Sequence, residues 1–140
     1  MSTDNRQIEK LQTNLSSLRK IAGWTAEDLG NELDVTKQTI SNLETGKTKM
    51  SRVQYIAIRA VLDMEAKKNE NLSKAMNLVL NDYDSTAKEQ EKNEEKVKTV
   101  AAATNKGVSA DMLGAILGAS VASITMSILE WLPELLKKDK

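Results

Sequence analysis

The chain has 140 residues, of which 20 are lysine or arginine and 20 are aspartate or glutamate, so its formal net charge is zero. It contains no cysteine and no histidine, which excludes disulfides, thiolate nucleophiles, imidazole bases and the usual zinc ligands. Enzymatic chemistry is therefore not expected, and neither a metal nor another cofactor is predicted.

The charge is unevenly distributed along the chain. Between residues 36 and 59 there are five basic side chains and one acidic side chain, although the whole chain is balanced. A local excess of positive charge attracts a polyanion such as nucleic acid. The N-terminal residues include no apolar run of the kind found in signal peptides, and a cytoplasmic location is expected.

The sequence pattern is helical nearly throughout, because apolar residues recur every three or four positions and no stretch alternates as a strand does. A first helix is expected to end at Gly23. Thr25 then caps a second helix, with Asp28 three residues later as in a capping box. Thr36 caps a third helix, which Gly46 ends.

A fourth helix is expected after the capping box formed by Ser51 and Gln54. Its apolar face is predicted to consist of Val53, Ile56, Ala57, Ala60, Val61 and Met64. A short amphipathic helix is expected next, over residues 72–80. Residues 88–98, KEQEKNEEKVK, are almost entirely charged, which favours a solvated helical spacer over an interaction tail.

The third helix has an uncharged polar stripe. Its amide and hydroxyl side chains recur at i, i+3, i+4 and i+7 and therefore share one face: Gln38, Ser41, Asn42 and Thr45. A solvated face is the ordinary alternative, but such a face usually includes charged residues. The stripe indicates a surface that hydrogen-bonds a partner.

Two helices joined by a tight turn, with a polar stripe on the second, form a helix-turn-helix arrangement. The stretch WTAEDLGNELDVTKQTISNLETGKTKMSR resembles the DNA-binding domain of Cro/C1-type (XRE family) repressors, and LETGKTK resembles the matching stretch of lambdoid phage repressors. The resemblance covers about residues 10–66. It implies an all-α, lambda-repressor-like domain of four to five helices over residues 6–68.

The resemblance also implies roles for individual residues. Base-reading positions of the recognition helix, residues 36–45, fall on Lys37, Gln38, Ser41 and Asn42. Phosphate-contacting positions fall on Thr25, Thr36, Thr45, Lys47, Lys49 and Arg52. Arg19 and Glu44 match a pair that forms an ion pair between the first and third helices in some members.

Further positions match the framework of the family, and two depart from it. Gly30 falls where a small residue lets the second and third helices touch, and Val35 falls where an apolar residue locks the turn to the core. Asp34 replaces a common glycine in that turn, but aspartate tolerates the left-handed conformation. Ala26 replaces a phosphate-gripping glutamine, although the backbone N–H groups of the helix N-terminus remain.

The function implied is a sequence-specific DNA-binding transcriptional regulator, specifically a dimeric repressor of a phage, plasmid or other mobile element. A dimer would bind a palindromic operator in double-stranded DNA, with half-sites about 34 Å apart. The alternative is a membrane-attached helix-turn-helix adaptor on the cytoplasmic face of the membrane, which binds a protein partner rather than DNA.

Two segments follow the helix-turn-helix domain: a short amphipathic helix with the charged spacer over residues 69–106, and an apolar helical tail over residues 107–140. The tail is expected to serve self-association or membrane attachment. Its small residues lie on one side and suit helix–helix contact: Gly114, Gly118 and Ala122.

The setting of the tail is open between a homodimer and a membrane. Residues 112–129 include no charged side chain, and 18 helical residues rise about 27 Å, close to the roughly 30 Å hydrocarbon core. A membrane contact would run through residues 112–132, where Trp131 suits the interface. Lysines flank both ends of the run, which favours burial of the tail against its copy in a dimer.

Overall fold

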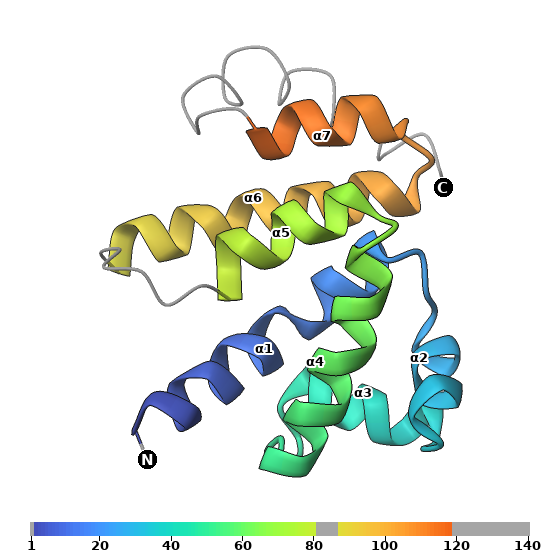
Figure 1. Cartoon of the computed structure of the whole chain (residues 1–140), viewed down its shortest axis with the longest axis vertical. Coiled ribbons are helices and arrows are strands. Elements are labelled where there is room, and N and C mark those ends of the chain that lie inside the picture. Colours follow the sequence, from blue (N-terminus) through green and yellow to red (C-terminus); the bar gives the residue numbers. More distant parts are fainter. Residues whose placement is uncertain (1, 81–86, 119–140) are drawn as a thin grey trace.

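The computed structural model describes residues 2–80 and 87–118. These residues form seven helices and no strand, which confirms the expected all-α fold (Figure 1). The helices are α1 (Ser2–Ile21), α2 (Ala26–Leu33), α3 (Lys37–Thr45), α4 (Arg52–Ala66), α5 (Glu70–Leu80), α6 (Ala87–Asn105) and α7 (Ala110–Gly118).

The local signals expected at the helix ends are present. The Thr25 hydroxyl accepts from the backbone N–H of Asp28, and the Asp28 carboxylate accepts in return from the Thr25 N–H. Ser51 and Gln54 form the same reciprocal box at the start of α4. Gly46 ends α3 with a φ of 79°, a left-handed conformation that glycine adopts without strain.

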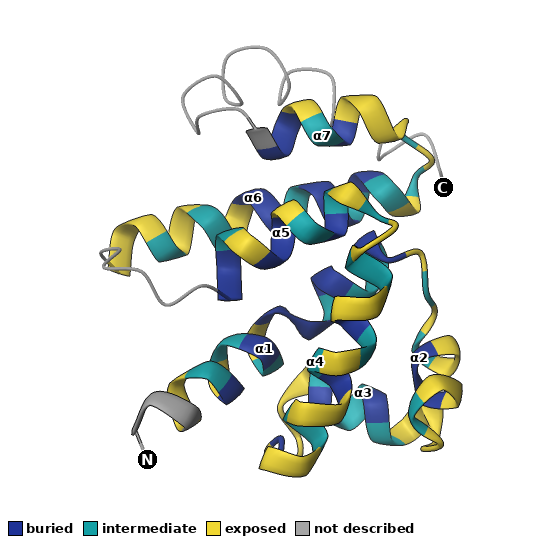
Figure 2. Cartoon of the chain, viewed as in Figure 1, coloured by how far each residue is buried: buried dark blue, intermediate teal, exposed yellow. Residues whose placement is uncertain are grey.

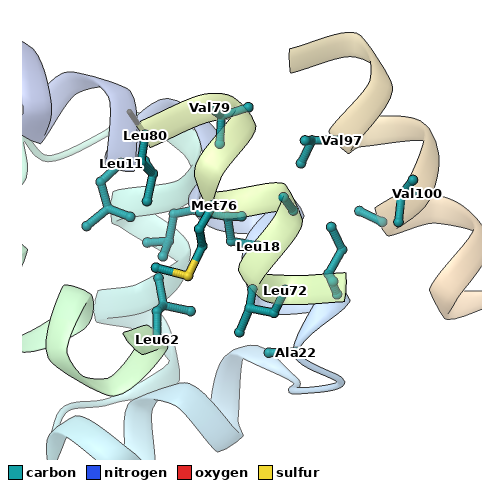
Figure 3. Packing of buried hydrophobic residues seen from close by; sticks show 14 of the residues in the cluster. Leu11, Leu18, Ala22, Leu62, Leu72, Met76, Val79, Leu80, Val97 and Val100 are labelled. Carbon is teal, nitrogen blue, oxygen red and sulfur yellow. The ribbon is translucent and has the colours of Figure 1, made fainter. Parts of the chain in front are cut away.

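Helix α1 is the central element of the fold, since it contacts α3, α4, α5 and α6. Leu11 and Leu18 are fully buried on α1. The same hydrophobic core extends to Leu62 on α4, Leu72 on α5 and Val97 on α6 (Figure 3). The helix-turn-helix segment and the helices that follow it therefore share one core.

The helix expected over residues 88–98 is present in α6, and most of its residues are exposed or half-buried, but its last turn is packed in the fold and is not a solvated spacer. Helix α6 packs against α1, α5 and α7, and it buries Lys96, Val97 and Val100. The Lys96 Nζ donates to the carbonyl oxygen of Leu117, at 3.3 Å, near the end of α7. Burial lowers the pKa of Lys96. The charged run misleads because a lysine stem can pack in an apolar contact while its ammonium hydrogen-bonds a backbone carbonyl.

The apolar face predicted for α4 is also wrong. The core contacts of α4 are made by Ile58 and Leu62, whereas Val53, Ile56 and Met64 are exposed to solvent. Much of the α4 ribbon is accordingly exposed (Figure 2). Helix α4 has apolar residues on two sides, so periodicity alone does not determine which side faces inward. The side of α4 with more apolar residues is the side that faces solvent.

The described part of the apolar tail is α7, and it packs on α5 and α6 of the same chain. Leu113, Ile116 and Leu117 are buried there. Gly114 lies against α5, because a Cβ added to it would be 3.1 Å from the Asn71 side-chain oxygen. The small-residue side of α7 thus already faces a neighbouring helix at this position.

Among residues 2–80 and 87–118, no helix has the length and apolar character needed to cross a bilayer. Ala122 and most of the apolar run lie outside the described residues, and nothing of the Gly118 surroundings is described.

Candidate nucleic-acid interface

The turn between α2 and α3 is closed by backbone geometry. Asp34 adopts the left-handed conformation, with φ 58° and ψ 41°, as the turn requires. The Val35 N–H donates to the Gly30 carbonyl oxygen at 2.9 Å. A Cβ on Gly30 would lie 2.7 Å from the Val35 carbonyl oxygen, so only glycine fits where the turn crosses α2. The Val35 side chain, expected to lock the turn to the core, is partly exposed instead.

Helix α3 is oriented by its two apolar residues. Ile40 and Leu43 are buried, and the opposite side of the helix therefore faces outward. Lys37 and Gln38 are exposed there, and Asn42 is half-buried. Ser41, also half-buried, belongs to the same polar stripe.

Two amide side chains on the outer side of α3 form a connected pair. The Gln38 Nε2 donates to the Asn42 Oδ1 at 2.9 Å. This bond holds both side chains in one orientation and leaves the Gln38 oxygen as an acceptor and the Asn42 nitrogen as a donor. An acceptor beside a donor matches the N6 amino group and N7 that adenine presents in the major groove.

The segment after α3 carries the basic side chains. Lys47 and Lys49 are exposed, while Met50 is buried and anchors the segment to the core. The Thr48 N–H donates to the Asn42 carbonyl oxygen at 3.3 Å, so this lysine loop, residues 46–50, folds back on the end of α3. The lysines thereby lie close to the helix with the polar stripe.

One residue that the sequence analysis does not identify holds this loop in place. The Gln12 side chain on α1 donates to the carbonyl oxygens of Leu43, at 2.9 Å, and Thr48, at 2.8 Å. Its Oε1 accepts from the Met50 N–H at 2.9 Å. No local pattern could have shown this role, because the three partners lie 31 to 38 residues along the chain.

The three threonines assigned to phosphate contacts are exposed, and each hydroxyl has a local partner. Thr25 and Thr36 cap α2 and α3. The Thr45 hydroxyl donates to the Asn42 carbonyl oxygen at 3.3 Å. The hydroxyls of the two caps accept from backbone N–H groups, and a hydroxyl that accepts still has a proton to donate. The Thr36 hydroxyl also lies 2.9 Å from the Thr39 hydroxyl, and either of these two can be the donor. Arg52 is exposed at the first turn of α4.

Arg19 and Glu44 lie together beneath this surface. The Arg19 guanidinium contacts both Glu44 carboxylate oxygens and donates a third hydrogen bond to the Trp24 carbonyl oxygen at 2.9 Å. Glu44 is the one acidic residue between positions 36 and 59. Because its charge is matched by Arg19, no acidic side chain of that segment offsets the charges of Lys37, Lys47 and Lys49.

Comparison with known proteins gives one match. Residues 15–65 match a family model described as "Helix-turn-helix". The matched segment includes α2, α3 and nearly all of α4, together with the last third of α1. No curated protein and no solved structure matches the chain.

Proposed function

We propose that the helix-turn-helix domain of the Cro/C1 type over residues 15–65 is the DNA-binding module of a transcription regulator, and that α3 reads base edges in the major groove of double-stranded DNA. The observation that carries the proposal is the hydrogen-bonded pair of Gln38 and Asn42 on the outer side of α3, beside a loop of exposed lysines.

Base readout falls to the polar stripe of α3. The Gln38 oxygen and the Asn42 nitrogen together suit an adenine edge or another adjacent acceptor and donor. Lys37 is exposed at the start of the helix, where it can reach a guanine or a phosphate. Ser41 belongs to the same polar stripe as Gln38 and Asn42 and supplies a hydroxyl.

Phosphate binding falls to groups around α3. Lys47, Lys49 and Arg52 supply positive charge, and the hydroxyls of Thr25 and Thr36 supply hydrogen bonds. The Thr45 hydroxyl joins them when it turns from the Asn42 carbonyl oxygen to a phosphate. These contacts position the domain but do not distinguish sequences. Since Ala26 offers no side-chain clamp at the start of α2, the affinity depends more heavily on Lys47 and Lys49.

The regulator acts as a dimer in the cytoplasm, because one domain of this kind covers only half a site. Two domains related by a two-fold axis bind a palindromic operator with half-sites about 34 Å apart. Occupation of a promoter by such a dimer represses transcription, a role common among the phage, plasmid and mobile-element repressors that the domain resembles.

Selection of bound sequences from a random DNA pool, followed by salt titration on the winning site, tests this function. A regulator yields a palindromic consensus and loses affinity steeply as salt rises. Gln38→Ala should weaken binding to the preferred site, whereas Asn77→Ala, a matched amide control at an exposed position of α5, should not. An adaptor that binds a protein partner gives neither a consensus nor a selective effect of Gln38→Ala.

A further inference from the structure

Helix α4 presents an apolar stripe to solvent that the proposed DNA contacts do not use. Val53, Ile56 and Met64 are 77%, 57% and 69% exposed, and Ala57 and Ala60 lie exposed between them. Three large side chains at these exposures present on the order of 350 Å² of apolar surface, which is comparable with the largest apolar patch of a typical monomer, a patch that is often functional. Binding to DNA does not account for the stripe, because apolar side chains offer neither charge nor hydrogen bonds to the phosphate backbone.

The order of residues along the stripe is self-complementary. Val53 and Met64 lie at equal distances from the middle of the stripe, one on each side. Ala57 and Ala60 lie next to the middle, also one on each side. An antiparallel copy of α4, related by a two-fold axis at this middle, therefore brings each Val53 to the Met64 of the other copy. The alanines then meet at the centre, where small side chains let the two helices approach closely.

The charges beside the stripe are complementary in the same register. Arg52 and Asp63 lie on one flank of α4, near opposite ends of the stripe. A two-fold axis keeps like flanks together, so Arg52 of each copy lies near Asp63 of the other. Asp63 is already 3.3 Å from the Arg59 Nε, yet its side chain is 54% exposed and can accept a second cation.

We propose that α4 is the contact between two copies of this chain, packed antiparallel about Ala57 and Ala60. The contact extends beyond the stripe, because a standard interface buries about 800 Å² on each partner. Two surface hollows border α4 and supply the additional area. One is lined by Val35 and Gln54, and the other by Trp24 and Val61.

The role of this contact in the cell rests on the proposed function, and an antiparallel pair of α4 helices is compatible with binding to a palindromic operator. Helix α4 begins directly after the lysine loop, so an antiparallel pair places the two loops at opposite ends of the contact. The two α3 helices are then related by the same two-fold axis as the half-sites of a palindrome.

The test is the oligomeric state of the full chain without DNA, measured by sedimentation equilibrium. The wild type should be a dimer. Ala60→Glu and Met64→Glu bury a carboxylate in the contact and should each raise the dimer dissociation constant thirtyfold or more, an effect of about hot-spot size. Met112→Glu is the matched control, because Met112 is also exposed, on α7, and that variant should remain as dimeric as the wild type.

A charge exchange tests the register separately from folding. Arg52→Asp and Asp63→Arg should each weaken the dimer, and the two changes combined in one chain should restore it. Circular dichroism confirms that every variant compared is folded. A monomeric wild type overturns the proposal. So does a dimer that persists in both glutamate variants because residues 107–140 hold the two copies together. A dimer that fails to bind DNA contradicts the proposed function and leaves this contact intact.

Discussion

The Arg19 Nε lies 2.6 Å from the Glu44 Oε2, and the Arg19 Nη2 lies 3.1 Å from the Glu44 Oε1, so the two side chains form a two-pronged ion pair. The side chains are only 13% and 11% exposed. The pair joins α1 to the last turn of α3. It thereby fixes the helix with the polar stripe to the centre of the fold and neutralises the one carboxylate beneath it.

Loss of either partner of this pair should destabilise the domain severely. Arg19→Met or Glu44→Met leaves a desolvated charge, at a cost of about 3–5 kcal/mol in the free energy of unfolding. The double variant should cost less than the sum of the single variants, because neither charge then remains. Urea unfolding of all four proteins measures the coupling.

The exposed pair of Glu70 and Lys74 on α5 is the control for that cycle. Its side chains are 83% and 44% exposed, and solvent screening should limit its coupling to about 0.2–1 kcal/mol. A coupling between Arg19 and Glu44 no larger than this control would show that the inner pair contributes no more than a surface contact.

Gln38 and Asn42 should govern sequence preference. Alanine at either position should cost about 1–3 kcal/mol on the preferred site and relax the choice of base there. Because the Gln38 amide holds the Asn42 oxygen, the two substitutions should be non-additive on that site. Equal losses on preferred and random DNA would remove α3 as the reading helix.

Lys47 and Lys49 should act on all DNA alike. Alanine at either position should weaken specific and random sequences to the same degree and reduce the salt slope by about one unit, since one phosphate contact is lost. Lys98→Ala, at an exposed position of α6, is the matched control and should leave the slope unchanged. An unaltered salt slope in the Lys47 and Lys49 variants would show that these lysines do not contact phosphates.

Local chemistry explains what could be predicted from the sequence. Caps and turns depend on neighbours within a few residues, so the boxes at Thr25 and Ser51 and the left-handed Asp34 follow directly from residue types. The choice between two apolar sides of α4 depends on its packing against α1, which lies far away in the chain, and against α5. The burial of Lys96 likewise depends on the carbonyl of Leu117, which no periodicity indicates.

Gln12 is the clearest case of a role that only the tertiary structure reveals. In the sequence it is one polar residue beside the apolar positions of α1. In the fold its amide makes three hydrogen bonds to backbone groups of Leu43, Thr48 and Met50. These bonds hold the lysine loop from both sides, and we expect Gln12 to affect DNA binding only through the position of that loop.

Substitution of Gln12 should therefore weaken DNA binding without changing sequence preference. Gln12→Ala removes three bonds and leaves two carbonyls and one N–H to find water. We expect a loss of about 1–3 kcal/mol in unfolding free energy, since the partners remain partly accessible. The loop should then hold Lys47 and Lys49 less firmly, and affinity for specific and random DNA should fall together.

If Gln12 had only a structural role, its substitution would lower the stability of the fold, but its effect on DNA affinity would not depend on Lys47 and Lys49. In a chain that already has Lys47→Ala and Lys49→Ala, Gln12→Ala should cost little further affinity at temperatures where every variant is folded, although it should cost the same stability as before. Full additivity in affinity would show that Gln12 supports the fold and has no part in placing the loop.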